Sequence, residues 1–304
     1  MNVAQSTLAS AHGSSWSTPH ALEEPSVQVT YAVSCPSATT CVVVNGRGQA
    51  LIRDNGHWST PHLVEAGGSF DALSCASTTF CVAIASASAV TYDGHTWSRP
   101  VLVGPRGYSY HLSCPSTTFC AAVGASDVVG GANVLATFDG HAWRLVTSPG
   151  SRAPNNRLLG VSCASSRFCV AANMDGHLFT FDGRRWAASR AVGPTGLISV
   201  ACPSSTFCMV VSMNGEAMTR RGTTWSHERA ISRFAKDLAY SVSCANAREC
   251  QVIGLSGRAM SWRDGQWSSP AVVFPGAASA GVQVSCSRSG FCVAINDYAK
   301  TASN

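Results

Sequence analysis

The sequence predicts an all-β protein, a seven-bladed β-propeller built from four-stranded antiparallel blades. Three observations predict it: fourteen cysteines in evenly repeated pairs, a tryptophan after a tight turn in each repeat, and no helical periodicity of useful length. Every pair has the spacing C-x5-C, and first cysteines of successive pairs lie 39 to 49 residues apart. Such a period is typical of propellers and repeat arrays. The pairs are Cys35 and Cys41, Cys75 and Cys81, Cys114 and Cys120, Cys163 and Cys169, Cys202 and Cys208, Cys244 and Cys250, and Cys286 and Cys292.

Each repeat is predicted to contain four short strands. In residues 71–103, two β-rich segments flank the polar turn between the cysteines, and a second pair of strands is joined by Asp93-Gly94. An Asp-Gly pair between β-rich segments is a strong hairpin signal. A tryptophan follows each such turn, at Trp58, Trp97, Trp143, Trp186, Trp225 and Trp267. We expect one domain over 1–304, with blades at about 26–64, 68–104, 108–147, 157–193, 196–231 and 238–274, and a last blade from 281–304 plus 1–24.

The last blade is expected to join both ends of the chain. A seventh tryptophan turn ends at Trp16, before the first cysteine pair, and only one more candidate strand, 298–303, follows the last pair. The N-terminal segment therefore supplies the outer strand that the last repeat lacks. This closure removes the open sheet edges of the ring.

The D-G-x-x-W turns resemble those of the Asp-box (BNR-repeat) propellers, which include sialidases, sortilin-like receptors and several lectins. The Asp-box pattern is S/T-x-D-x-G-x-x-W, whereas Asp and Gly are adjacent here, so the turn is one residue shorter. The element from Ser113 to Cys120 resembles secreted bacterial repeat proteins of unassigned function. The resemblance implies a secreted bacterial propeller that is a lectin or a non-catalytic relative of the sialidases.

The cysteines are predicted to form one disulfide hairpin in each blade rather than metal sites. Zinc sites usually use C-x2-4-C spacing with a second pair or a histidine nearby, and the even dispersal does not fit that arrangement. We therefore expect no metal, and an extracellular or cell-surface location, where disulfides persist. Met1 leads into no charged segment or apolar core, so we expect that a signal peptide or preceding domains were removed.

Composition excludes several classes of protein. Charged residues make up 12% of the chain, about half the usual share of about 25%, which excludes a coiled coil or a disordered linker. No apolar run of about 18 residues exists, so we expect no membrane span. The 19 arginines are scattered, which disfavours nucleic acid as a partner. No phosphate loop or comparable motif is present, so we expect no cofactor.

Several repeated positions indicate packing between blades rather than a ligand site. Serine precedes the first cysteine in six of the seven units, with Ala201 as the exception, and an aliphatic residue stands one position earlier in all of them. Phenylalanine precedes the second cysteine in five units, and the tryptophans also suit packing at the blade edge.

Candidate site residues lie where the units differ from one another. Strand order places the cysteine hairpins and Asp-Gly turns on one face and the other loops, including insertions at 126–132 and 148–157, on the opposite one. Tyr31, Tyr110 and Tyr240 could form an aromatic rim there, and Asp71 and His111 differ from the residues at the same position of the other units. Each candidate can also be interpreted as an ordinary packing or solvated residue. The candidate ligand-binding residues are Tyr31, Asp71, Tyr110, His111, Asp127, Asn156, Arg157, Asp175, Glu216, Tyr240, Gln283 and Asp297, with Arg47 and Arg258 as further polar candidates.

Three functions are compatible with these residues. The first is a secreted glycan-binding propeller, because aromatic faces with nearby amides and carboxylates suit sugar rings. The second is a glycoside hydrolase or polysaccharide lyase with one central site that uses Asp71, His111, Tyr110 or Glu216. The third is a protein-interaction scaffold of a secreted assembly. The repeated chemistry favours binding over catalysis, and the arginine triad that a sialidase needs cannot be assembled.

Overall fold

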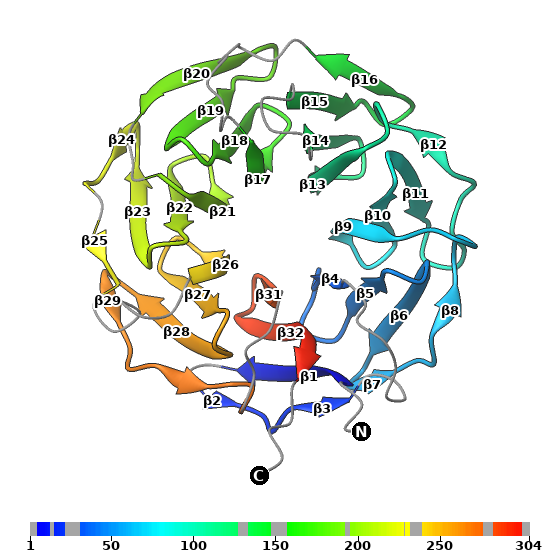
Figure 1. Cartoon of the computed structure of the whole chain (residues 1–304), viewed down its shortest axis with the longest axis horizontal. Helices are drawn as coiled ribbons and strands as arrows, with labels where there is room; N and C mark the ends of the chain where they lie inside the picture. The colour runs from blue at the N-terminus through cyan, green and yellow to red at the C-terminus, as the bar shows by residue number, and fades with distance from the viewer. Residues whose placement is uncertain are drawn as a thin grey trace.

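The computed structural model is a ring of antiparallel sheets around a central axis (Figure 1). It describes residues 5–12, 15–21, 31–126, 133–146, 157–191, 195–227, 229–231, 239–275 and 282–299. The described residues form seven sheets, in each of which four strands follow one another outwards from the axis. The prediction of an all-β propeller with four-stranded antiparallel blades and a disulfide in each blade is confirmed.

Six of these sheets are each built from one continuous stretch of chain, and we number them as blades 1 to 6. Blade 1 contains β4 (Tyr31–Ser34), β5 (Cys41–Asn45), β6 (Gln49–Asp54), β7 (His57–Trp58) and β8 (His62–Leu63). Blade 2 contains β9 (Phe70–Ser77), β10 (Phe80–Ala85), β11 (Ser88–Tyr92) and β12 (Val101–Leu102). Blade 3 contains β13 (Tyr108–Ser116), β14 (Phe119–Ser126), β15 (Asn133–Phe138) and β16 (Trp143–Val146).

The next three blades repeat the same strand order. Blade 4 contains β17 (Leu158–Ser165), β18 (Phe168–Asn173), β19 (His177–Phe181) and β20 (Trp186–Ala191). Blade 5 contains β21 (Leu197–Ser204), β22 (Phe207–Ser212), β23 (Glu216–Arg221), β24 (Thr224–Trp225) and β25 (Arg229–Ala230). Blade 6 contains β26 (Ala239–Asn246), β27 (Glu249–Gly254), β28 (Arg258–Arg263), β29 (Gln266–Trp267) and β30 (Ala271–Val272).

The remaining sheet, blade 7, joins the two ends of the chain. Its strands are β31 (Val282–Cys286), β32 (Phe291–Ala299), β1 (Gln5–His12), β2 (Ser15–Trp16) and β3 (His20–Ala21). The expectation of a separate third strand over 298–303 is wrong in its described part, because β32 runs through to Ala299 as the second strand. The third strand is β1, which pairs along β32 from Gln5↔Ala299 to His12↔Phe291.

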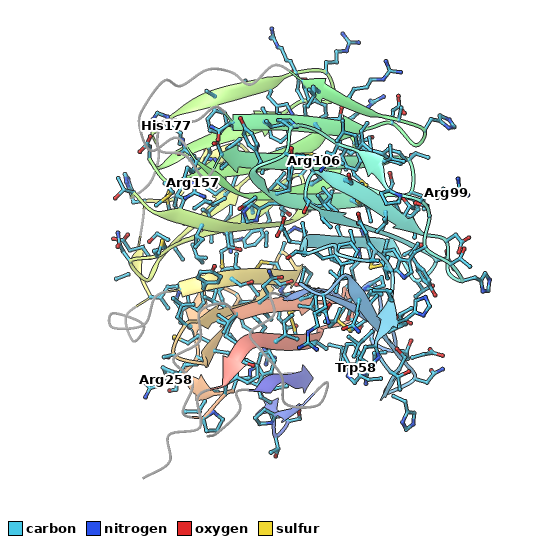
Figure 2. The ribbon with its side chains drawn as sticks, turned by 45° about the vertical axis from the view of Figure 1, so that its right-hand side comes forward. Trp58, Arg99, Arg106, Arg157, His177 and Arg258 are labelled. Atoms are coloured by element: carbon cyan, nitrogen blue, oxygen red, sulfur yellow. A yellow bond between two sulfur atoms is a disulfide. The ribbon has the colours of Figure 1, made fainter. Side chains whose placement is uncertain are left out.

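Strand direction gives the ring two different faces. The innermost strands start on one face, which we call the loop face, and end at the disulfide hairpins on the other, which we call the cysteine face. Figure 2 shows Arg157, His177 and Arg258 on one side of the ring and Trp58 on the other. The turns between third and fourth strands, such as Asp93-Gly94 after β11, also lie on the cysteine face.

A disulfide joins the first two strands of every blade. Cα–Cα distances across these bonds are 3.9 to 4.1 Å, and each closes a five-residue hairpin at the cysteine face. All fourteen cysteines are paired as the spacing predicts. From blade 1 to blade 7, the bonds join Cys35 to Cys41, Cys75 to Cys81, Cys114 to Cys120, Cys163 to Cys169, Cys202 to Cys208, Cys244 to Cys250 and Cys286 to Cys292.

The serine before the first cysteine connects each blade to the next. Its hydroxyl oxygen accepts a hydrogen bond of 2.9 to 3.0 Å from the backbone N–H of the first cysteine in the following blade. The donor–acceptor pairs are Cys75–Ser34, Cys114–Ser74, Cys163–Ser113, Cys202–Ser162, Cys286–Ser243 and, across the ring closure, Cys35–Ser285. Ala201 cannot supply this bond to Cys244. At that junction the backbone N–H of Val242 donates to the Ser199 hydroxyl at 3.1 Å, a bond that the next junction makes in addition, from Val284 to Ser241 at 3.2 Å.

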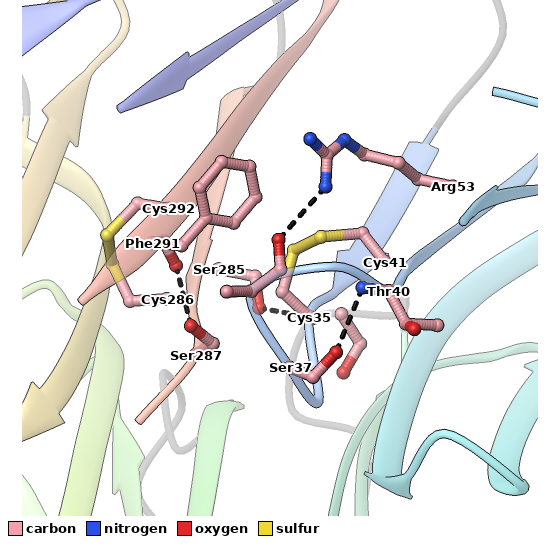
Figure 3. The surroundings of a disulfide bond; sticks show 12 residues. Cys35, Ser37, Thr40, Cys41, Arg53, Ser285, Cys286, Ser287, Phe291 and Cys292 are labelled. Atoms are coloured by element: carbon pink, nitrogen blue, oxygen red, sulfur yellow. Dashed lines mark hydrogen bonds between the residues drawn. A yellow bond between two sulfur atoms is a disulfide. The ribbon is translucent and has the colours of Figure 1, made fainter. Parts of the chain in front are cut away.

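The junction between blades 7 and 1 is drawn in Figure 3. The Cys35 N–H donates to the Ser285 hydroxyl at 2.9 Å, and the guanidinium of Arg53 lies 4.6 Å from the centre of the Phe291 ring. Arg53 also donates to the carbonyl oxygen of Ala38 at 3.0 Å. Cation–π and hydrogen-bond contacts thus support the closure.

Apolar side chains fill the space between blades. One core cluster combines Phe207 and Met209 of blade 5 with Val252 and Trp262 of blade 6. The tryptophans predicted at the blade edge pack on aromatic residues of the third strand in three blades, with ring centroids 5.2 to 5.5 Å apart: Tyr92–Trp97, Phe138–Trp143 and Phe181–Trp186. The repeated apolar positions therefore build the scaffold.

Candidate functional site

The central channel opens towards the loop face as a cavity of about 190 Å³. All seven innermost strands line it, mostly with small or aliphatic side chains. Its polar side chains are Asp71, His111, Ser199, Tyr240, Ser241 and Gln283. Sequence comparison of the units singled out four of these (Asp71, His111, Tyr240 and Gln283), and the structure brings them around one opening.

A β-bulge places Asp71 in this cavity. In blade 2 the register shifts between Ile84 and Ala85, so that Asp71 is the extra residue opposite them. Bulges commonly re-aim a side chain, because the extra residue leaves the regular alternation of the strand. Equivalent shifts occur at Leu159, Ile198 and Tyr240, and those side chains also line the cavity.

Tyr110 also stands four residues before the first cysteine of its unit, but it does not line the cavity. It pairs with Gly124 without a bulge, its side chain is 1% exposed, and its hydroxyl donates to the carbonyl oxygen of Pro105 at 2.8 Å. Gly104 and Gly124 leave the space for the ring, since a Cβ on Gly104 would lie 2.7 Å from the tyrosine hydroxyl oxygen. Burial, with the neighbouring Tyr108, raises the pKa of Tyr110 to about 12. The predicted aromatic rim is therefore wrong for Tyr110, which is a core residue.

His111 is the one imidazole on the cavity wall among the described residues. Burial, together with the positive charge of Arg157, lowers the pKa of His111 to about 4. The ring is therefore neutral at neutral pH, with one nitrogen that donates and one that accepts a hydrogen bond. Arg157 stands immediately before β17 in the next blade and is half-buried.

Glu216 and Asp175 do not join Asp71 at the cavity. Glu216 begins the third strand of blade 5, and its carboxylate accepts a hydrogen bond of 3.1 Å from the Ser212 hydroxyl in its own turn. Asp175 lies in the turn between β18 and β19. Since Tyr110 is buried as well, the four residues named for a hydrolase or lyase do not surround one point in the part of the chain that the structure describes.

Arg47 and Arg258 are exposed and do not line the cavity, and the other sequence candidates fall outside what the structure describes in full. Asp127 and Asn156, with most of the insertions at 126–132 and 148–157, lie outside the described residues. Tyr31 and Asp297 lie in β4 and β32, whose side chains are not described at these two positions. In the described ranges, no three His, Cys, Asp or Glu side chains form a group that could hold a metal ion. Nor does any described segment form a helix that could cross a membrane.

Sequence comparison missed a second opening, at the cysteine end of the channel. This cavity has a volume of about 400 Å³ and is lined by the seven first cysteines and by Arg288. Arg288 is the one charged residue two positions after a first cysteine, where the other units have serine or asparagine. The same column-by-column comparison that selected Asp71 would have found it.

Neither a known family nor a curated protein matches the sequence. Solved structures match over most of the chain at low identity. YCF48 bound to D1 peptide has a TM-score of 0.61 at 12% identity, over 100% of this chain and 97% of that one. YCF48 from Cyanidioschyzon merolae gives 0.62 at 14%, over 95% and 97%.

Two further matches are propeller domains. The WD40 propeller domain of Doa1 has a TM-score of 0.67 at 11% identity, over 87% of this chain and 90% of that one. The propeller domain of Cps50 (Swd1) from Myceliophteria thermophila gives 0.66 at 10%, over 88% and 95%. At these identities the matches show the propeller fold alone. They give no support to the resemblance to Asp-box propellers and sialidases.

Proposed function

We propose that this chain is a protein-interaction propeller that binds an extended segment of a partner across the loop face. The observation that supports it best is the cavity at the centre of that face, where a carboxylate, an imidazole, a phenol and an amide from four different blades converge. Identical blades would present identical groups. Unlike groups around one opening suit a single asymmetric ligand, such as a peptide.

The size of the cavity favours one side chain of a partner over a whole small molecule. Pockets for drug-sized ligands usually measure roughly 300–1,000 Å³, whereas this one measures about 190 Å³. The carboxylate of Asp71 accepts hydrogen bonds, and the neutral His111 both accepts and donates them. A partner side chain with N–H or O–H donors therefore fits the wall chemistry.

The similar structures and the disulfides support a peptide as the ligand and a partner outside the cytosol. Among the matches, YCF48 is seen with a bound D1 peptide, so a propeller of this shape can bind a peptide. The seven disulfides are typical of an oxidising compartment. We accordingly place the partner outside the cytosol, on an extracellular or cell-surface protein.

Selection from a displayed peptide library against the intact, oxidised protein tests the proposal. We expect selected peptides to share one donor-bearing residue. Asp71→Asn and His111→Ala should each weaken their binding about tenfold, because the first replaces an acceptor oxygen and its negative charge by an NH2 donor and the second removes the imidazole. Arg288→Ala at the opposite end of the channel is the matched control and should bind as the parent does.

Two outcomes would overturn the proposal. One is a set of selected peptides whose binding is unchanged in both loop-face variants while the thermal unfolding of each variant matches the parent. The other is a glycan array in which the parent binds sugars and both variants lose that binding, which would establish the lectin function instead.

A further inference from the structure

Arginines gather on the cysteine face of blades 4 to 6. They lie in the disulfide hairpins or at the turns after the third strands, and all but Arg220 are well exposed. The arginines are Arg167, Arg184, Arg185, Arg220, Arg221, Arg248 and Arg263, and the acidic residues among them are Asp182, Glu249 and Asp264. We call these seven arginines the arginine patch.

The acidic residues neutralise only part of this charge. Each pairs with one arginine: Arg185–Asp182 at 3.7 Å, Arg248–Asp264 at 2.7 Å and Arg263–Glu249 at 2.8 Å. Within the described ranges, no carboxylate lies within ion-pair distance of the other four, which are Arg167, Arg184, Arg220 and Arg221. Among the described residues, four guanidinium groups on one face thus have no carboxylate partner.

Direct contacts make the patch continuous across three blades. The Arg220 guanidinium of blade 5 lies 4.7 Å from the ring centre of Phe168 in blade 4. Arg221 lies 5.7 Å from the ring of Trp262 in blade 6, and its charge acts on Asp264 beside it. Arg167 packs beside Gly183, next to Arg184, in blade 4. These aromatic rings hold the guanidinium groups against the surface.

The equivalent turns of blades 1 to 3 have a different charge. They contain His57, His95 and His141 beside an aspartate, where blade 4 has Arg184. Arg144 on that side pairs with Asp139 at 3.1 Å, and Arg53, which stands in blade 1 where blade 5 has Arg220, is followed by Asp54 where blade 5 has Arg221. The excess of positive charge is therefore a property of one half of the cysteine face and not of the repeat.

We propose that the arginine patch is a docking surface for an acidic segment of a protein, separate from the loop-face site. Guanidinium groups bind carboxylates through paired N–H donors in a fixed plane. A segment with spaced Asp or Glu side chains can meet the four arginines that have no carboxylate partner among the described residues, of which Arg220 also donates to the carbonyl oxygen of Ser205, and can avoid the three carboxylates between them. A continuous polyanion, by contrast, would place phosphates against those carboxylates.

Binding of a fluorescent peptide of alternating Glu and Ser to the full, oxidised chain tests this proposal. We expect the peptide to bind at about 50 mM salt and to bind several-fold more weakly at about 200 mM, because exposed charges are screened. A peptide of alternating Gln and Ser should not bind. The double variant of Arg184→Glu with Arg221→Glu should lose about tenfold or more of the affinity, since reversal of two charges at a complementary surface is repulsive.

The matched control combines Arg99→Glu with Arg106→Glu, which reverses two exposed arginines outside the patch and should leave the affinity within about twofold of the parent. Thermal unfolding and circular dichroism establish that both double variants fold. Equal losses of affinity in the two double variants would mean that the peptide responds only to the net charge of the protein. That result would overturn the proposal. Tighter binding of a single-stranded oligonucleotide of equal charge, lost in the same variant, would also overturn it.

Discussion

The two ends of the central channel are built by the same strands but from opposite kinds of sequence. At the cysteine end, the cysteine, the preceding serine and the aliphatic residue before it recur from blade to blade. At the loop-face end, three and four positions before the first cysteine, the residues differ from blade to blade. Asp71, His111, Tyr240 and Gln283 stand there among small and aliphatic neighbours. The comparison indicates that repeated residues hold the ring and that unrepeated ones distinguish its surfaces.

The cysteine end should account for most of the stability of the ring. Each short disulfide loop contributes about 2 kcal/mol in the chain-entropy model, and domains are stable by only about 5–15 kcal/mol. Full reduction should therefore unfold the protein at 25 °C, while replacement of Cys163 and Cys169 by alanine should lower the free energy of unfolding by about 2 kcal/mol. Urea titration followed by tryptophan fluorescence measures both. A reduced protein with an unchanged urea midpoint would show that packing and hydrogen bonds suffice.

The loop-face end should give the protein a specific sensitivity to acid. His111 has a pKa of about 4 in the folded chain, against about 6.5 when unfolded, because desolvation and the nearby Arg157 charge disfavour its protonated form. The side chains of Asp71 and Tyr240 lie on the same cavity wall. Between these values the unfolded state binds more protons, so the free energy of unfolding falls as the pH drops from 6.5 to 4. His111→Gln should reduce this fall in urea titrations at about pH 7, 5.5 and 4.5.

Two comparisons distinguish the effect of His111 on the pH dependence of stability from the effects of other titratable groups. His95→Gln removes an exposed turn histidine and should keep the pH dependence of the parent. The turn aspartates Asp93, Asp139 and Asp182 have lowered pKa values through hydrogen bonds from backbone N–H groups, so the stability they contribute is lost at the acid end of this range and below it, equally in the parent and in His111→Gln. An unchanged slope in His111→Gln would contradict the assignment.

The serine bonds between blades should have a smaller effect. Ser113→Ala leaves the Cys163 N–H without its acceptor and should lower the free energy of unfolding by about 1 kcal/mol. Ser116→Ala, in the exposed hairpin of the same strand, is the control and should change it by less than about 0.5 kcal/mol.

The natural exception offers the reverse test, because Ala201→Ser would restore a hydroxyl opposite the Cys244 N–H. We expect a gain of about 0.5 kcal/mol, and a loss would show that Ala201 packs too tightly to admit it.

The scaffold could be predicted from the sequence because its interactions are local or repeated. C-x5-C spacing confines each disulfide to one hairpin, and the serine repeated before the first cysteine indicates the contact between blades, although not the atom to which it bonds. The sharing of a blade by both termini followed from counting tryptophan turns. The order of strands in that blade was mistaken, since strand pairing over nearly the full chain length is not a local property.

The candidate site could be predicted only in part because its geometry depends on strand register. Tyr110 and Tyr240 occupy the same column, yet a bulge turns Tyr240 into the cavity and Tyr110 stays buried over Gly124. No single-strand pattern distinguishes the two cases. Asp71 was found because its chemistry is unusual in its column, although the bulge that places it was not foreseen.

The pairing of β1 with β32 has a consequence for the order in which the ring can form. One edge of β1 pairs with β2 and β3, which follow it directly, but its other edge pairs with β32, which comes far later in the sequence, so the backbone N–H and C=O groups of that edge lack their partner until β32 has been made. An unpaired strand of this kind is an edge to which other chains can add. The ring is therefore most exposed to misassembly during synthesis, and its sequence-distant closure makes that final step slow.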